Sequence, residues 1–173
     1  SIHTLCPTSI CPPLPSSTKT GLIVTIEDQL STVDPRQGCC GQPAANSGHR
    51  RRARQVARQL LELYERDDAD VLLVPSGSCA TQIHHLPGLF EDSDPWHRRA
   101  VALSARTLEL SQLLTDRLGV TDVGARLDAR LAWHDACHGL RELCVQQGPR
   151  ALLRHVREAT LVEPDAPPTC CGF

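Results

Sequence analysis

Short runs of aliphatic residues alternate along the chain with segments whose apolar residues recur at helical spacing. The runs at 21–26 and 70–75 are continuous, as in strands that are buried on both faces of a parallel sheet. Between them, the spacing predicts an amphipathic helix from about 49 to 66, with Asn46, Ser47 and Gly48 as candidate N-caps. The inner face of this helix is expected to contain Val56, Leu60, Leu63 and Tyr64.

The same alternation continues through the second half of the chain. A helix is expected to open at 76–79 and to run to about His85, and a long helix is expected from Pro95 to about Leu118, closed by Gly119. The remaining expected elements are a strand at 131–134, short helices at 140–146 and 149–156, and a strand at 160–163. The pattern therefore predicts an α/β fold with a mostly parallel sheet flanked by helices.

Two adjacent cysteines followed by glycine occur twice, as Cys39-Cys40-Gly41 and as Cys170-Cys171-Gly172. Cys6 precedes the first pair by 32 intervening residues, and Cys137 precedes the second pair by the same interval. This internal repeat, offset by 131 residues, indicates two related units, the second of them incomplete. Adjacent cysteines seldom form a disulfide with each other, but one metal centre can take ligands from both. The pattern therefore favours metal ligation.

The repeat sorts the cysteines into two candidate ligand sets. The first contains Cys39, Cys40 and Cys79, since Cys79 follows a predicted strand at the sheet edge where open α/β folds place their sites. Cys6 is preferred over Cys11 as its fourth member because it reproduces the spacing of the repeat. The second set contains Cys137, Cys170 and Cys171.

The second set lacks a fourth member, because the counterpart of Cys79 would fall at position 210, beyond Phe173. Cys144 is a possible substitute, although its helical context favours a buried structural thiol. The chain is accordingly divided into an irregular segment at 1–32, a first repeat at 33–128 and a partial second repeat at 129–173.

Composition excludes several classes of function. The net charge is −2 and aromatic residues make up 3% of the chain, which argues against a nucleic-acid partner. We expect neither a membrane span nor a signal peptide, because no apolar run is long enough. In a reducing compartment such as the cytoplasm, nine cysteines indicate metal ligation rather than disulfides. Lys19 is the only lysine, which we attribute to coding bias.

Five segments together resemble the cysteine-rich "CCG" domain family, from about Val33 to Phe173. They are Cys-Cys-Gly-Gln-Pro-Ala-Ala-Asn-Ser-Gly, Val-Pro-Ser-Gly-Ser-Cys, Thr-Leu-Glu-Leu, Trp-His-Asp-Ala-Cys-His-Gly-Leu-Arg-Glu-Leu and Cys-Cys-Gly-Phe. The most similar branch is the lactate utilisation protein A type, which is related to iron–sulfur subunits of glycolate oxidase, anaerobic glycerol-3-phosphate dehydrogenase and heterodisulfide reductase. Residues 1–32 and the ending at Phe173 depart from the family pattern, so the chain resembles a shortened version.

The resemblance implies iron–sulfur ligation by Cys39, Cys40 and Cys79, and by Cys137, Cys170 and Cys171. It implies a four-thiolate [4Fe–4S] cluster at one site, because Ser76 stands where one branch has a further cysteine. The implied role is electron transfer in a cytoplasmic complex that oxidises L-lactate or a related 2-hydroxy acid, with other subunits of a lactate or glycolate oxidation complex as partners. The chain would be one component of an oxidoreductase rather than a catalyst alone.

Two alternatives remain open at this point. One is a thiol–disulfide or zinc-binding structural module without a cluster, in which Cys39 and Cys40 are redox thiols or ligands. His134 and His138 flank Cys137, but no Cys-x2-Cys spacing accompanies them, which argues against zinc. The other alternative is a structural remnant whose thiols bind nothing.

Overall fold

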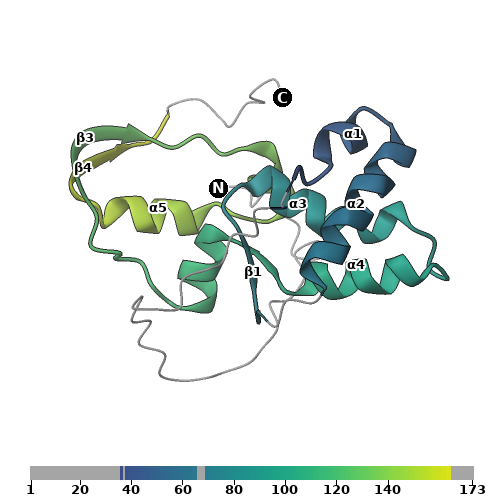
Figure 1. Ribbon diagram of the computed structural model, residues 1–173. Helices are drawn as coiled ribbons and strands as arrows, with labels where there is room; N and C mark the ends of the chain where they lie inside the picture. The colour runs from purple at the N-terminus through teal and green to yellow at the C-terminus, as the bar shows by residue number, and fades with distance from the viewer. Residues whose placement is uncertain (1–35, 37, 66–68, 165–173) are drawn as a thin grey trace, which may run out of the picture. The chain divides into compact units, whose positions relative to one another are not determined.

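The computed structural model describes residues 36, 38–65 and 69–164. The predicted strand at 21–26 and Cys6, Cys11, Cys170 and Cys171 lie outside these ranges. The described chain forms two compact units (Figure 1). Unit 1 contains residues 73–81 and 108–164, and unit 2 contains residues 36–72 and 82–107 within the described ranges. The predicted division into repeats at 33–128 and 129–173 stays a prediction.

Unit 2 is built from helices around α2, which spans Arg50–Tyr64 and confirms the predicted helix. Short α1 (Gln42–Asn46) precedes it, and η1 (Pro87–Leu89) and α4 (Pro95–Ala105) pack against it. Asp94 caps α4 by accepting a hydrogen bond from the Trp96 N–H at 2.9 Å. The α2 side chains buried in this unit are Ala53, Ala57, Leu60, Leu61 and Tyr64.

The start of α2 differs from the sequence-based expectation. Its N-cap is His49, which makes no side-chain capping bond, whereas Asn46 ends α1. The arginines of the first turn lie at the positive end of the helix dipole, which is unfavourable. Two of them donate hydrogen bonds outside the helix, Arg50 to the Gly88 carbonyl at 3.1 Å and Arg54 to the Leu89 carbonyl. These bonds tie α2 to η1 and offset part of the dipole cost.

Unit 1 contains the larger parallel strand pair. β3 (Arg126–Ala132) pairs in parallel with β4 (Arg157–Val162), and the register ends at Ala132 opposite Val162. α5 (Gln147–Arg154) packs against β4 (Figure 1). Two π-helical turns, η2 (Gln112–Arg117) and η3 (His138–Glu142), complete this unit. Helices and short parallel strands in two small sheets confirm the α/β class.

The boundary between the units runs through β1 (Leu72–Val74), α3 (Gly77–His85) and the first residues of β2 (Thr107–Glu109). β1 pairs with β2 in the second sheet. The strand and the helix predicted at 70–75 and 76–85 are thus present. However, Leu73 is 37% exposed, so the expectation of a strand buried on both faces is wrong.

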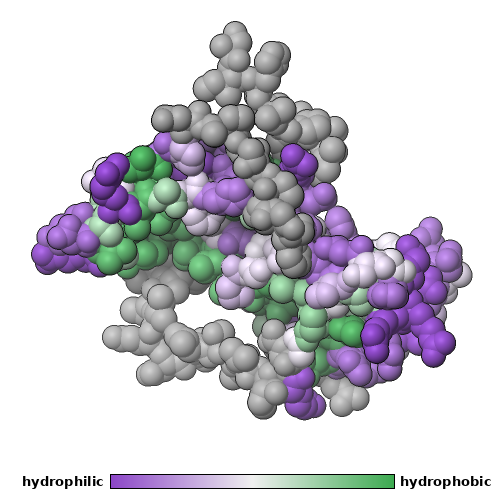
Figure 2. Space-filling model, turned by 90° about the horizontal axis from the view of Figure 1, so that it is seen from above, coloured by the Kyte–Doolittle hydropathy of each residue, from purple (hydrophilic) through white to green (hydrophobic). Residues whose placement is uncertain are grey.

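The predicted long helix from Pro95 to Leu118 is also wrong. Helix α4 ends at Ala105, and the chain then enters β2. The Thr107 hydroxyl donates a hydrogen bond to the Leu103 carbonyl at 2.8 Å, and β2 pairs with β1. Val101 on α4 is 46% exposed. Val123 and Leu127, beside and within β3, are exposed as well. Figure 2 shows hydrophobic residues at the surface on one face of the molecule. No described helix is both long and apolar enough to cross a bilayer.

His84 gives unit 2 a predictable response to pH. Its ring Nδ1 lies 3.0 Å from the Ser104 hydroxyl, and burial, followed by the nearby His85, lowers the pKa of His84 from its ordinary value of 6.5. The unfolded chain therefore takes up a proton below about pH 6.5 more readily than the folded chain does. We expect the free energy of unfolding to fall as the pH drops from 7.5 to 5.5, and to fall less in His84→Gln.

Urea denaturation at both pH values measures this difference. The matched control is His49→Gln, which changes an exposed histidine and is expected to keep the wild-type pH dependence. Equal slopes for wild type and His84→Gln would contradict the assignment.

Candidate metal centre

The Cys39–Cys40 pair lies in unit 2, immediately before α1. The Cys39 side chain is exposed and Cys40 is half-buried, and both are present as thiols. The buried Gly41 follows with a φ of 89°, in the left-handed region, and its N–H points to the Cys39 sulfur at 3.4 Å. A Cβ at Gly41 would lie 3.3 Å from Cγ1 of Val56 on α2. The turn therefore requires glycine, and it directs a backbone donor to the sulfur.

A cavity of about 620 Å³ opens beside this turn within unit 2. Cys39 and Gly38 line it together with apolar side chains of α2, among them Val56, Leu60 and Leu63. Arg36, Gln59 and Glu62 supply the polar part of the described lining. The Cys39 thiol thus borders a largely apolar hollow, where a negatively charged thiolate centre would be partly shielded from water.

Cys79 and Cys137 lie in unit 1, on two segments that pack together. Cys79 is in the first turn of α3, and Cys137 immediately precedes η3. A Cβ at Gly77 would lie 3.7 Å from the Gly139 backbone, and the Thr81 hydroxyl donates to the His138 carbonyl at 3.5 Å. Both cysteines are half-buried and present as thiols. Small residues thus allow the start of α3 to approach the start of η3 closely.

Three charged side chains hold the segment that carries Cys137. Arg150 on α5 donates to both carboxylate oxygens of Asp135, at 2.8 and 2.7 Å, and to Glu163 at 2.9 and 3.1 Å. The Trp133 indole N–H also donates to Asp135, at 3.0 Å. The Asp135 side chain is 3% exposed and that of Arg150 is 11% exposed. Hydrogen bonding from Arg150 lowers the pKa of Asp135, so this carboxylate stays ionised.

Sequence reasoning missed this network. Asp135 stands two residues before Cys137 in the Trp-His-Asp-Ala-Cys-His segment, which is the one signal that could have identified it. Nothing in the periodicity distinguishes Arg150 or Glu163 from other charged residues. His134 is exposed and His138 is half-buried, and the backbone carbonyl of His138, rather than its ring, makes the contact with Thr81.

Within the described ranges, no three Cys, His, Asp or Glu side chains come close enough to one another to hold a metal ion. Each predicted ligand set extends beyond these ranges, since Cys6 belongs to the first set and Cys170 and Cys171 to the second. The structure places Cys39 and Cys40 in unit 2 and Cys79 and Cys137 in unit 1. The assignment of seven cysteines to two sets therefore stays a prediction.

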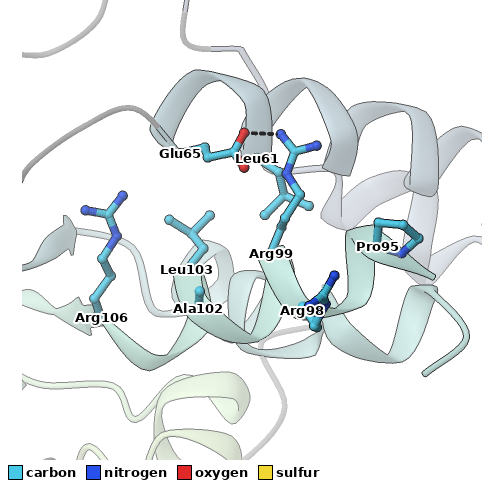
Figure 3. Close-up of a pocket in the computed structure, with 8 residues that line it drawn as sticks. All are labelled: Leu61, Glu65, Pro95, Arg98, Arg99, Ala102, Leu103 and Arg106. Carbon is cyan, nitrogen blue, oxygen red and sulfur yellow. Dashed lines mark hydrogen bonds and ion pairs between the residues drawn. The ribbon is translucent and has the colours of Figure 1, made fainter. Parts of the chain in front are cut away.

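A second cavity in unit 2, of about 600 Å³, lies between α2 and α4 (Figure 3). Arg99 is paired with Glu65 across it and stacks on the Trp96 ring, 3.8 Å from the centroid. Arg106 donates hydrogen bonds to the Tyr64 and Ala69 carbonyls, near the end of α2. Arg99 and Arg106 thus bind groups of the protein itself and help to join α2 to α4. The described lining of this cavity contains no cysteine or histidine, so we do not expect metal chemistry there.

Comparison with known proteins identifies the family. The family model described as "CCG: Cysteine-rich domain" matches residues 14–84 and 131–173, more than half of the chain. The chain belongs to the cysteine-rich CCG domain family. The two matched segments contain all the predicted ligands except Cys6, and they omit the region of α4, β2 and η2.

Three similar relatives are named lactate utilization protein A or lactate utilization protein A 1. Lactate utilization protein A of Exiguobacterium sp. (strain ATCC BAA-1283 / AT1b) is 42% identical over 137 residues, and that of Bacillus cytotoxicus is 43% identical. Lactate utilization protein A 1 of Bacillus cereus (strain AH820) is 42% identical. Each alignment covers 79% of this chain and 56% of the relative, so the chain spans little more than half the length of these relatives. No solved structure matches the chain.

The Gly41 turn can be tested apart from any metal. We expect Gly41→Ala to lower the free energy of unfolding by roughly 1–2 kcal/mol, because it places a Cβ in the left-handed region and against Val56. The matched control is Gly38→Ala on the other side of the cysteine pair, where a Cβ meets nothing within 4 Å. Urea denaturation of the metal-free protein measures both, and equal stability of the two variants would contradict the requirement for glycine at position 41.

Proposed function

We propose that this chain is an iron–sulfur electron-transfer subunit of a complex that takes part in lactate utilisation. The observation that carries the proposal is membership of the CCG family together with two repeated cysteine pairs. The similar relatives named lactate utilization protein A support L-lactate, or a related 2-hydroxy acid, as the compound that the complex oxidises. The partners would be other subunits of a lactate or glycolate oxidation complex, located in the cytoplasm.

The proposed ligands are the cysteines of the two sets. Cys39, Cys40 and Cys79, with Cys6 or Cys11, would hold one [4Fe–4S] cluster. Cys137, Cys170 and Cys171 would form a second, incomplete set. The described members fit such a group in chemistry, since they are thiols and the Gly41 N–H is directed at the Cys39 sulfur. A bound cluster would supply one-electron transfer.

The protein would set the properties of that centre through its own groups. A hydrogen bond from Gly41 to the Cys39 sulfur withdraws charge from the thiolate and so raises the reduction potential of whatever the thiolate binds. The apolar cavity beside Cys39 acts in the opposite direction, because a low dielectric disfavours added negative charge. The balance between these two effects would determine which partner can deliver electrons.

Metal and sulfide analysis tests the proposal. Protein prepared without oxygen is expected to contain about four iron and four acid-labile sulfide per chain, with broad absorption near 400 nm, approximate values typical of one [4Fe–4S] cluster. Cys79→Ser is expected to lose most of both, because it removes one thiolate ligand. Ser78→Ala, which changes the preceding residue in the same turn, serves as the matched control and is expected to keep them.

The other outcomes discriminate between functions. Zinc without sulfide would favour a zinc-binding structural module over an iron–sulfur protein. Metal-free protein in which Cys39 and Cys40 cycle between thiol and disulfide would favour the redox-thiol alternative. Unchanged iron in Cys79→Ser would contradict the ligand assignment.

A further inference from the structure

The two segments that carry the second cysteine set leave the same edge of a sheet. β3 and β4 are parallel, and their last paired residues are Ala132 and Val162. The carboxyl ends of both strands therefore lie next to each other. Cys137 follows the end of β3 by five residues, and Cys170 follows the end of β4 by eight. The strand register places the starts of these two segments side by side. It does not by itself determine the position of the Cys137 thiol.

Arg150 connects the two chain exits at this edge. Its guanidinium binds Asp135, which belongs to the segment after β3, and Glu163, which directly follows β4. It also donates to the Gln146 carbonyl at 2.9 Å, which anchors it to the start of α5. The planar guanidinium can reach both carboxylates at once, whereas an ammonium group cannot present the same fork. One side chain thus fixes three segments of unit 1.

The connection is stiff on the side of Cys137. Asp135 accepts hydrogen bonds from Arg150 and from Trp133 and is almost fully buried, so Ala136, which joins it to Cys137, has little freedom. On the far side of Cys137, the His138 carbonyl accepts a bond from Thr81 and Gly139 packs against Gly77. Contacts between protein groups therefore fix the chain on both sides of Cys137.

We propose that Arg150 is a positioning residue for Cys137, which it places for metal binding by holding Asp135 and Glu163 together at the carboxyl edge of the β3–β4 sheet. This inference rests on the proposed function, because it assumes that Cys137 is a ligand. Among the described residues, Arg150 contacts Asp135, Glu163 and Gln146 and none of the proposed ligands. It acts through the backbone that carries one, and groups of this kind commonly change metal affinity by about 10–100-fold when they are removed.

Cadmium protection of individual cysteines tests the proposal. Reduced, metal-free full-length chain is titrated with Cd²⁺ and pulsed with iodoacetamide, and mass spectrometry measures the alkylation of each cysteine. In Arg150→Gln, we expect the Cd²⁺ concentration that half-protects Cys137 to rise about 10–100-fold, while the value for Cys39 in unit 2 stays unchanged. Cys39 thereby serves as an internal reference in the same molecule.

The matched control is Arg154→Gln, one turn further along α5. Arg154 also approaches Glu163, at 3.7 Å, but its side chain is 56% exposed and it makes no bond to Asp135. Its removal is expected to leave the protection of Cys137 unchanged. If Arg154→Gln and Arg150→Gln give the same result, the effect comes from charge alone and the positioning role is refuted.

A second variant covers the possibility that Arg150→Gln fails to fold. Glu163→Gln removes only the 44%-exposed end of the network and keeps the buried Asp135–Arg150 pair. It is expected to fold as the wild type does and to require more Cd²⁺ than the wild type for protection of Cys137, while the value for Cys39 stays unchanged. Wild-type protection of Cys137 in Arg150→Gln, or in Glu163→Gln where Arg150→Gln does not fold, overturns the inference but leaves the proposed function standing. If no cysteine of the wild type is protected, both are overturned.

Discussion

The arrangement of unit 1 depends on the buried ion pair between Arg150 and Asp135. A charge that is removed from water is tolerated only when it is paired and hydrogen-bonded, and loss of one partner of such a pair costs roughly 3–5 kcal/mol. Here the two partners come from α5 and from the segment after β3, and Glu163 adds the segment after β4. Neither α5 nor the segment after β3 can move away without leaving a buried charge unpaired, whereas Glu163, whose side chain is 44% exposed, is only a partly buried third partner. The network therefore makes the cysteine-bearing edge of the sheet one cooperative piece.

Unit 2 fixes its cysteines by a different physical means. The Cys39–Cys40 turn contains no buried charge pair among its described contacts, and it depends on the backbone freedom of Gly41 and on contact with Val56. Close backbone approach leaves an N–H directed at sulfur, which a side chain at this position would prevent. The turn is then held against α2, and Arg54 holds α2 in place by bonding the end of η1. Steric fit in one unit and charge pairing in the other achieve the same result, which is that contacts of the protein itself fix the backbone next to a cysteine.

The amphipathic pattern predicted α2 well, because α1, η1 and α4 pack against it and bury its apolar side chains. The positions of α3 and α5 were also predicted. The prediction failed between Arg106 and Leu118, where Leu108 and the leucines of η2 continue the helical pattern but the Thr107 hydroxyl bonds the Leu103 carbonyl and β2 pairs with β1. Tertiary pairing overrides a local pattern in such cases. The cysteines could be singled out from the repeat alone. Arg150 could not, since a buried arginine has no sequence signature until its two carboxylate partners are known.

The abundance of arginine, which composition alone attributes to coding bias, has structural consequences. Arg150 bonds two carboxylates and a carbonyl, Arg106 bonds two carbonyls, and Arg126 forms a two-pronged pair with Glu158. Each of these uses the planar, five-donor guanidinium, which a lysine ammonium cannot replace with the same geometry. In a chain with 3% aromatic residues, few large rings are available to join one segment to the next. Forked arginine contacts serve that purpose instead, so coding bias by itself does not account for them.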